Sequence, residues 1–265
     1  MNIDLTGRRA LVTGSTAGIG AAIALGLARA GAEVTVNGRS PERTREAAAH
    51  IGAAAGAPHR VRAAAADVGT AEGCAALIAA VPDVDVLVNN AGVFTPIPVF
   101  EIPDEEWRRA FEVNVMSGVR LSRHHVPRMV ERGWGRAIFI SSESALQIPA
   151  EMVQYGMTKT AQLAVSRGMA ESVAGSGVTI NSVLPGPTLT EGVREMLGHG
   201  DTADEAVVER AGREFIAAAR PTSLLGRLAT PEEVANMVVY VASPQASATS
   251  GAALRVDGGV VRAIP

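Results

Sequence analysis

The chain of 265 residues is poor in lysine, cysteine and aromatic residues. Of its 24 basic residues, 23 are arginine, and Lys159 is the only lysine. Cys74 is the only cysteine, so no disulfide can form within the chain, and we expect a reducing, cytoplasmic location. Aromatic residues make up 3% of the sequence, so the core must be built from Ala, Val, Leu and Ile.

The sequence also lacks a strong net charge and long apolar runs. A net charge of −3 gives no support for nucleic acid or an anionic membrane as a partner. No 18 successive residues are apolar, and the N-terminal segment carries Asp4, Arg8 and Arg9, so we expect neither a membrane span nor a signal peptide. A hydrophobic content of 47% is enough for a large core, and the length fits one α/β domain.

Short apolar runs alternate with longer amphipathic segments along the whole chain. Such alternation predicts a parallel sheet with helices on both faces. The runs expected to be strands are Ala10–Thr13, Val34–Asn37, Val61–Ala65, Val84–Asn89, Ala137–Ser141, Val178–Leu184 and Ala253–Val256. The clearest helical segments are Gly20–Ala30, Pro41–Ala55, Asp104–Glu131, Gln154–Ala174 and Pro231–Ala242. No linker or repeat divides the chain, so we predict a single doubly wound (Rossmann) α/β domain over residues 1–265 with seven parallel strands.

One long stretch, Thr188–Gly226, falls outside this alternation. It follows the sixth expected strand, is polar, and has a helical pattern near Ala203–Ala219. Ligands bind beyond the carboxyl ends of the strands in such sheets. Residues 188–226 thus begin on the side of the sheet where a ligand is expected.

A glycine-rich turn follows the first expected strand, with the sequence Thr13-Gly14-Ser15-Thr16-Ala17-Gly18-Ile19-Gly20. Glycines allow the backbone to approach a pyrophosphate, whose charge is favoured at a helix N-terminus. Many α/β proteins need such a turn for packing alone. Its position at the first strand–helix junction is typical of a dinucleotide site.

The end of the second expected strand bears on the choice between NAD(H) and NADP(H). An acidic residue there would bind the ribose 2′-hydroxyl of NAD. The sequence instead has Asn37-Gly38-Arg39, and Arg39 could meet the 2′-phosphate of NADP. This favours NADP(H), with NAD(H) open if Arg39 faces solvent and Asn37 binds the ribose alone.

Tyr155 precedes the single lysine by four residues, a spacing that puts both side chains on one face of a helix. An ammonium group beside a phenol can lower its pKa from about 10 and make it usable in proton transfer. Arginine is wide and planar and cannot replace lysine as a compact charge. The alternative is a surface pair without chemistry.

Taken in order, these motifs resemble those of the short-chain dehydrogenases/reductases, in particular the 3-oxoacyl-carrier-protein reductase-like members. The resemblance covers essentially the whole length. It rests on a serine 13 residues before a Y-x-x-x-K motif, and on several flanking motifs. These are Thr13–Gly20, Asp67-Val68, Asn89-Asn90-Ala91-Gly92, Asn114, Ser142, Tyr155-Gly156-Met157-Thr158-Lys159, Pro185-Gly186 and Asp257-Gly258-Gly259.

The resemblance implies a role for each matching residue. Tyr155 would be the proton donor in reduction, Lys159 would lower its pKa and bind the nicotinamide ribose, Ser142 would hydrogen-bond the substrate carbonyl, and Asn114 would hold a water in a proton route. Ser142 rather than Ser141 has the required spacing. The cofactor-binding residues implied are Gly14, Ser15, Thr16, Gly18, Ile19, Gly20, Asn37, Arg39, Asp67, Val68, Asn90, Ala91, Gly92, Tyr155, Lys159, Pro185, Gly186 and Thr188.

The expected function is hydride transfer between a nicotinamide cofactor, NADP(H) with NAD(H) possible, and a small carbonyl or secondary alcohol substrate. An NAD(H)-dependent alcohol or polyol dehydrogenase, or a dinucleotide sensor without turnover, are the alternatives. The resemblance further implies a homotetramer and a substrate lid at about residues 188–226. Methionines such as Met152 and Met196 are more often packing residues, but these two fall where members of the family shape the substrate pocket. Glu143, next to the expected catalytic serine, either contacts substrate, makes a salt bridge or faces water. No metal site is expected, because the adjacent His124 and His125 face apart on a helix.

Overall fold

The computed structural model describes residues 2–200 and 204–264 and contains one sheet of seven parallel strands. The strand order is β3-β2-β1-β4-β5-β6-β7, a doubly wound arrangement that confirms the predicted fold. The strands are β1 (Arg9–Val12), β2 (Glu33–Gly38), β3 (Val61–Ala65), β4 (Val86–Asn89), β5 (Gly135–Ile140), β6 (Val178–Pro185) and β7 (Ala253–Val256).

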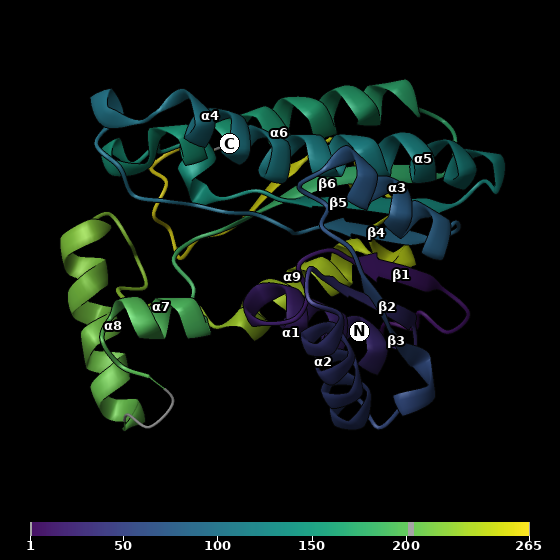
Figure 1. Ribbon diagram of the computed structural model, residues 1–265, viewed down its shortest axis with the longest axis horizontal. Coiled ribbons are helices and arrows are strands. Elements are labelled where there is room, and N and C mark those ends of the chain that lie inside the picture. The colour runs from purple at the N-terminus through teal and green to yellow at the C-terminus, as the bar shows by residue number, and fades with distance from the viewer. Residues whose placement is uncertain (1, 201–203, 265) are drawn as a thin grey trace.

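Helices cover both faces of the sheet (Figure 1). One face carries α1 (Gly18–Arg29), α2 (Pro41–Ala54) and α9 (Pro231–Val241). The other carries α3 (Ala71–Ala80), α4 (Asp104–Phe111), α5 (Ser117–Glu131) and α6 (Val153–Ser172). Short 3-10 turns lie at Pro58–Arg60, Val99–Glu101, Glu143–Ala145, Ala150–Met152 and Pro244–Ala246.

Two cores of small aliphatic side chains fill the space between sheet and helices. Alternate residues of one strand point to opposite faces, so Val86 and Val88 join the core under α1 and α9 while Leu87 joins the other. Phe139 is the only aromatic residue among the fully buried large side chains of the described ranges. Close contacts replace aromatic bulk: a Cβ added to Gly26 of α1 would lie 2.9 Å from Val239 of α9. This fits the core expected from the sequence.

The segment expected to be one helix over Asp104–Glu131 is divided. A π-helical stretch, Glu112–Met116, joins α4 to α5. Such single-turn bulges are frequent at functional sites, and the hydrophobic pattern carries no signal for the extra residue. The bulge contains Asn114, one of the expected site residues.

The segment 188–226 stands beyond the carboxyl ends of the strands, at the left of Figure 1. It contains α7 (Glu191–Met196) and α8 (Glu205–Ala219), joined by an ion pair between Arg194 and Glu205 at 2.7 Å. The helical pattern expected from Ala203 begins at Glu205, where Asp204 caps the helix by accepting a hydrogen bond from the Ala206 amide. Ala203 itself lies outside the described residues.

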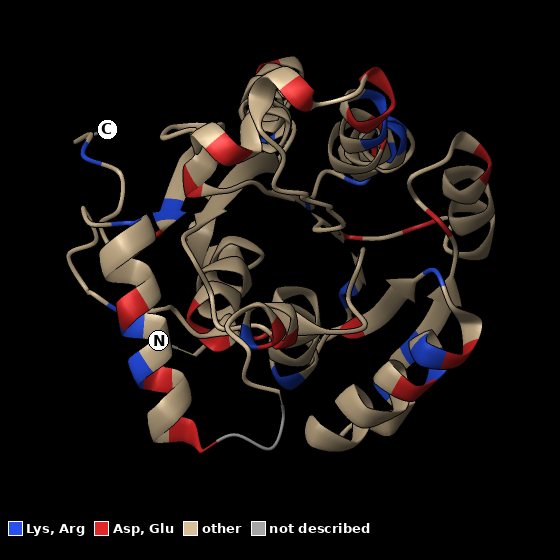
Figure 2. Ribbon diagram, turned by 60° about the vertical axis from the view of Figure 1, so that its left-hand side comes forward, with Lys and Arg blue, Asp and Glu red and all other residues tan. Residues whose placement is uncertain are grey.

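Acidic and basic residues are interspersed along the helices (Figure 2). In the described ranges, no helix has the length and apolar character needed to cross a membrane.

Candidate active site

The glycine-rich turn is shaped by contacts that leave no room for side chains. Gly14 and Gly18 have φ angles of +60° and +55°, in the left-handed region that favours glycine. A Cβ at Gly14 would lie 2.9 Å from the Cα of Ala91, and one at Gly20 would lie 2.4 Å from the Gly14 carbonyl oxygen. The turn therefore presents bare backbone at the N-terminus of α1, as a pyrophosphate requires.

Three polar side chains expected at the cofactor instead hold this turn in place. Ser15 Oγ donates to the Val12 carbonyl oxygen at 2.7 Å and accepts from the Asn37 amide at 3.0 Å. Asn90 Nδ2 donates to the carbonyl oxygens of Thr13 and Gly14 at 2.8 and 3.0 Å. Asn37 Nδ2 donates across the sheet to the Ala64 carbonyl oxygen at 3.0 Å. The Asn37 side-chain amide is therefore hydrogen-bonded within the protein, whereas the Arg39 side chain is not part of this framework.

Arg39 shares a hollow at the end of β2 with Thr16, Ser40 and Arg43. Arg43 lies in the first turn of α2 and was not expected from the sequence, although its position four residues after Arg39 was a usable signal. Two guanidinium groups beside the glycine-rich turn suit a phosphate group.

The remaining cofactor residues follow the ends of β3, β4 and β6. Asp67 is exposed and its carboxylate caps the Gly69 amide at 3.0 Å, whereas the Val68 side chain is buried in the core. The Ala91 amide donates to Thr13 Oγ1 at 3.0 Å. Thr188 donates to the Gly186 carbonyl oxygen at 2.9 Å.

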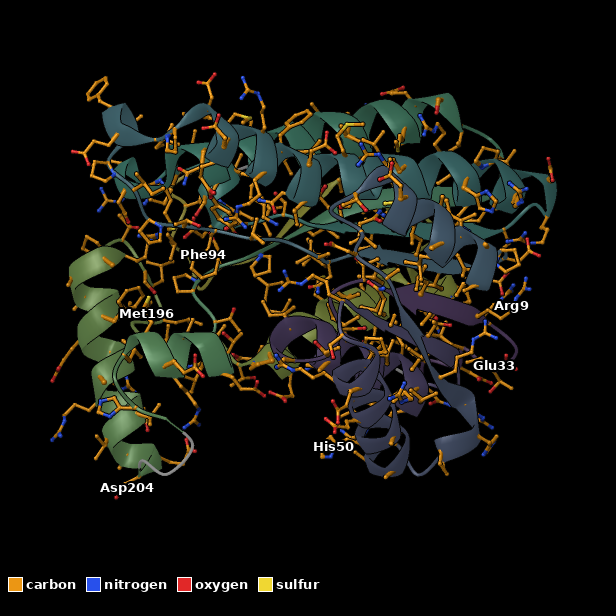
Figure 3. All side chains as sticks on the ribbon, viewed as in Figure 1. Arg9, Glu33, His50, Phe94, Met196 and Asp204 are labelled. Atoms are coloured by element: carbon orange, nitrogen blue, oxygen red, sulfur yellow. The ribbon has the colours of Figure 1, made fainter. Side chains whose placement is uncertain are left out.

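A cavity of about 450 Å³ lies between the carboxyl ends of the strands and the 188–226 segment. It brings together nine of the expected site residues: Ile19, Asn90, Gly92, Ser142, Tyr155, Lys159, Pro185, Gly186 and Thr188. Met152 and Met196 also line it, as expected. Figure 3 shows Phe94 and Met196 on opposite sides of the opening between the body and the 188–226 segment.

Lys159 is buried one turn of α6 beyond Tyr155. Its Nζ donates to the Ile140 carbonyl oxygen at 2.8 Å and lies 5.4 Å from the centre of the Tyr155 ring. A Cβ at Gly92 would lie 3.5 Å from both Lys159 Nζ and Asn114 Oδ1. Gly92 therefore lies directly beside both the lysine and the asparagine.

Asn114 does not line the cavity but contacts residues next to it. Its side chain accepts from the Val93 amide at 2.7 Å and donates to Thr158 Oγ1 at 2.9 Å. Its carbonyl oxygen accepts from Gln162 Nε2 at 2.6 Å. No sequence motif pointed to Gln162, which lies one further turn along α6 and is buried beside the expected proton route.

Burial moves the two ionisable groups toward their neutral forms. Loss of solvation raises the pKa of the Tyr155 phenol to about 12, an effect that Ser142 and Arg220 partly offset and Glu143 adds to. Loss of solvation also lowers the pKa of Lys159 to about 7. Desolvation dominates the pKa of the Tyr155 phenol, and the amine of Lys159 faces the Ile140 carbonyl oxygen. A phenol that stays protonated at neutral pH is the form that donates a proton to a carbonyl oxygen.

The three neighbouring serines have different environments. Ser142 lines the cavity, and its Oγ accepts from the Ser144 amide at 3.1 Å, which leaves its own proton available to a ligand. Ser141 Oγ donates to the Lys159 carbonyl oxygen at 2.8 Å and so anchors α6 to β5. The preference for Ser142 over Ser141 agrees with this geometry.

Glu143 and Arg220 form an ion pair in the cavity wall, with Arg220 Nε 2.9 Å from Glu143 Oε1. Of the three alternatives for Glu143, the salt bridge is present, and its partner comes from the end of α8. The two residues are 77 positions apart in the chain, so the sequence alone did not predict that they pair.

Comparison with known proteins gives a consistent result along the whole chain. The sequence model of the family described as enoyl-(acyl carrier protein) reductase matches residues 14–261. An uncharacterized oxidoreductase, YvaG of Bacillus subtilis, is 49% identical over 264 residues, with complete coverage of both chains. A D-beta-hydroxybutyrate dehydrogenase of Rhizobium meliloti is 33% identical and covers 95% of this chain and 98% of its own.

A solved structure of L-sorbose reductase from Gluconobacter frateurii, complexed with NADPH and L-sorbose, superposes with a TM-score of 0.91 at 33% identity, with complete coverage of both chains. The family model and the relatives match nearly the whole chain, and they describe the same family as the motifs that line the cavity. The chain therefore belongs to the short-chain dehydrogenase/reductase family and is an NAD(P)-dependent oxidoreductase.

Proposed function

We propose that this protein is an NADP(H)-dependent carbonyl reductase that also oxidises the corresponding secondary alcohol. The observation that carries this proposal is the convergence of Ser142, Tyr155 and Lys159 on one cavity that opens beside the glycine-rich turn. A hydroxyl donor, a protonated phenol and a buried amine are the groups that proton transfer to a carbonyl oxygen requires.

The chain's own residues would orient the substrate and move the proton. Ser142 Oγ would donate a hydrogen bond to the carbonyl oxygen and stabilise the charge that develops there. Tyr155 would transfer its phenolic proton to the same oxygen. The nicotinamide group, when bound, supplies the hydride in reduction and accepts it in oxidation. Lys159 would stabilise the phenolate that remains and bind the nicotinamide ribose.

Arg39 and Arg43 support NADP(H) as the preferred cofactor. Both line the hollow next to the glycine-rich turn, where the ribose 2′-phosphate would lie, and the described part of the hollow has no acidic residue. The NADPH complex of L-sorbose reductase and the NADP complex of a putative gluconate 5-dehydrogenase from Beutenbergia cavernae, 35% identical, are in line with this choice. Asp67 and Val68 would lie at the adenine, as the family resemblance implies.

An NAD(H)-dependent alcohol or polyol dehydrogenase is the second candidate, since D-beta-hydroxybutyrate dehydrogenases are among the relatives. A sensor without turnover is disfavoured, because the proton-transfer residues line the cavity.

The experiment is a turnover screen of the purified protein with NADPH and NADH against ketones, and with NADP⁺ and NAD⁺ against secondary alcohols. We expect oxidation of NADPH by at least one ketone, with kcat/KM at least tenfold above that with NADH. A preference for NADH would support the second candidate, and tight cofactor binding without turnover of any compound would contradict an enzymatic role.

A further inference from the structure

The Glu143–Arg220 pair is almost completely buried although it lines the substrate cavity. Glu143 is 2% exposed and Arg220 is 9% exposed. Glu143 opens the 3-10 turn directly after the catalytic serine, and Arg220 caps the end of α8 in the 188–226 segment. The pair therefore joins the catalytic floor to the segment that covers it.

The hydrogen bonds of this pair are incomplete. Glu143 Oε1 accepts from Arg220 Nε at 2.9 Å, and Arg220 Nη1 donates to the Ala219 carbonyl oxygen at 2.8 Å. Glu143 Oε2 is buried but has no hydrogen-bond partner among the described residues. A buried carboxylate oxygen without a donor is costly, and a pair selected only for stability would satisfy both oxygens. The free oxygen therefore calls for a donor that the cavity can admit.

The pair lies close to the reacting groups. Glu143 directly follows Ser142 in the chain, and Glu143 and Arg220 act in opposite directions on the pKa of Tyr155. Much of the remaining wall is apolar and includes Phe94, Met152, Val193, Met196 and Phe215. A ligand whose carbonyl contacts Ser142 and Tyr155 thus meets a buried ion pair in the cavity wall, together with polar Glu151, Asn90 and Thr190 and with the apolar side chains named above.

We infer that Glu143 and Arg220 are specificity-determining residues that bind a hydroxyl group of the substrate near the reacting carbonyl. The substrate class is a hydroxy ketone, and the reduced product is the corresponding diol. Glu143 Oε2 accepts the hydrogen bond of the substrate hydroxyl, and the Arg220 guanidinium donates to the oxygen of that hydroxyl. This inference rests on the proposed function and names the substrate class of the same site.

A carboxylate substrate fits the pair poorly. The charge of Arg220 is already matched by Glu143, and a second carboxylate would be repelled by the first. A neutral hydroxyl both donates and accepts, so it can complete the bonds of both residues. The substrate hydroxyl is unchanged by the reaction, in which the carbonyl carbon gains a hydride and the carbonyl oxygen gains a proton.

The test compares three small ketones with the wild-type protein and saturating NADPH. Hydroxyacetone carries the donor, methoxyacetone keeps the electron-withdrawing oxygen without a donor, and acetoacetate carries a carboxylate. A hydrogen bond to a charged group predicts a kcat/KM for hydroxyacetone about 10- to 150-fold above that for methoxyacetone. Acetoacetate should be the poorest of the three.

Matched variants assign this discrimination to the pair. Glu143→Gln keeps the shape of the side chain but removes its charge, so the ratio between hydroxyacetone and methoxyacetone should fall about tenfold. Glu195→Gln is the control, since Glu195 is exposed on α7 and does not line the cavity, and its ratio should match that of the wild type. Thermal unfolding shows whether Glu143→Gln is folded. If it is not, the ratio of kcat/KM between hydroxyacetone and methoxyacetone in the wild-type protein still tests the inference.

Equal kcat/KM values for hydroxyacetone and methoxyacetone, or a higher value for acetoacetate, would overturn the inference while leaving the reductase function in place. An unchanged ratio in a folded Glu143→Gln variant would also overturn it. Failure to reduce any carbonyl compound would contradict the proposed function itself, and the inference with it.

Discussion

At the scale of single residues, half-buried Tyr155 and buried Lys159 form a pair whose charges change during proton transfer. The phenol has a pKa of about 12 and is protonated at neutral pH, and the amine has a pKa of about 7. When the phenol gives up its proton, the phenolate is attracted to the ammonium in a site of low dielectric. Lys159 therefore acts mainly on the state that follows proton loss, which is where a catalytic interaction is most effective.

We predict that Lys159→Arg lowers kcat at least about 10²-fold although it keeps the positive charge. The buried site fits a compact ammonium that donates to the Ile140 carbonyl oxygen, and a planar guanidinium cannot take that position. Initial rates at saturating NADPH, together with NADPH affinity from fluorescence, separate loss of chemistry from loss of binding. An active variant with an unchanged pH profile would mean that the lysine serves another purpose.

Cofactor choice depends on the two guanidinium groups at the end of β2. We predict that Arg39→Ala weakens NADPH binding by about 10- to 150-fold and leaves NADH binding nearly unchanged, because only the 2′-phosphate distinguishes the two. Arg43→Ala should likewise weaken NADPH binding more than NADH binding. Arg45→Ala is the matched control, being exposed on the same helix but outside the hollow. Equal losses for both cofactors would indicate a structural role for Arg39.

The sequence identified the residues whose chemistry depends on local spacing. Ser142, Tyr155 and Lys159 were predicted because the serine and the Y-x-x-x-K motif are close in the chain, and all three line the cavity. Arg220 and Gln162 were missed because they reach the site through the fold: Arg220 lies 77 residues from its partner Glu143. The structural roles of Ser15, Asn37 and Asn90 were missed for the same reason, since their partners lie on neighbouring strands.

At the scale of elements, the π-helical stretch between α4 and α5 places Asn114 behind the catalytic lysine. In this stretch the Asn114 carbonyl oxygen accepts from Gln162, and its side chain binds the loop after β4 at Val93 and helix α6 at Thr158. Hydrophobic periodicity predicted an unbroken helix here because one inserted residue hardly changes the pattern. The alternation of strands and helices, by contrast, was predictable because each element is long enough to show the repeat of apolar residues typical of a strand or a helix.

The buried His125 of α5 makes stability depend on pH. Burial, and then the neighbouring His124, lower its pKa to about 4, with Arg128, Arg132 and Asp83 as the other charges nearby. The unfolded chain binds a proton near pH 6.5, so the contribution of neutral His125 is complete above that pH and is lost as pH falls toward 4.

Lowering the pH from 7 to 4.5 should reduce the free energy of unfolding of the wild type. We predict that this reduction is smaller in His125→Leu, by about 2 kcal/mol. Melting temperatures across this range measure the difference. His50→Leu, at an exposed position of α2, should follow the wild-type curve. Parallel curves for His125→Leu and the wild type would show that His125 is not kept neutral by burial.

At the scale of the whole molecule, we expect assembly into a homotetramer. The isolated chain exposes large apolar side chains, with Phe100, Leu224 and Ile264 at 100%, 86% and 97%. Helices α5 and α6 and the C-terminal segment are the candidate interfaces. Sedimentation at micromolar concentration should give the mass of four 27.3 kDa chains. A monomer under these conditions would contradict this expectation.

The central claim is that Tyr155 donates the proton during carbonyl reduction, and replacing it by phenylalanine tests this most directly. Phenylalanine keeps the ring and its edge contact with Phe94, at 6.0 Å between ring centres, and removes only the hydroxyl. NADPH-dependent reduction of a ketone that the wild type accepts should fall at least about 10²-fold in kcat, while NADPH affinity stays within a few-fold. A Tyr155→Phe enzyme that retained wild-type kcat would contradict the account.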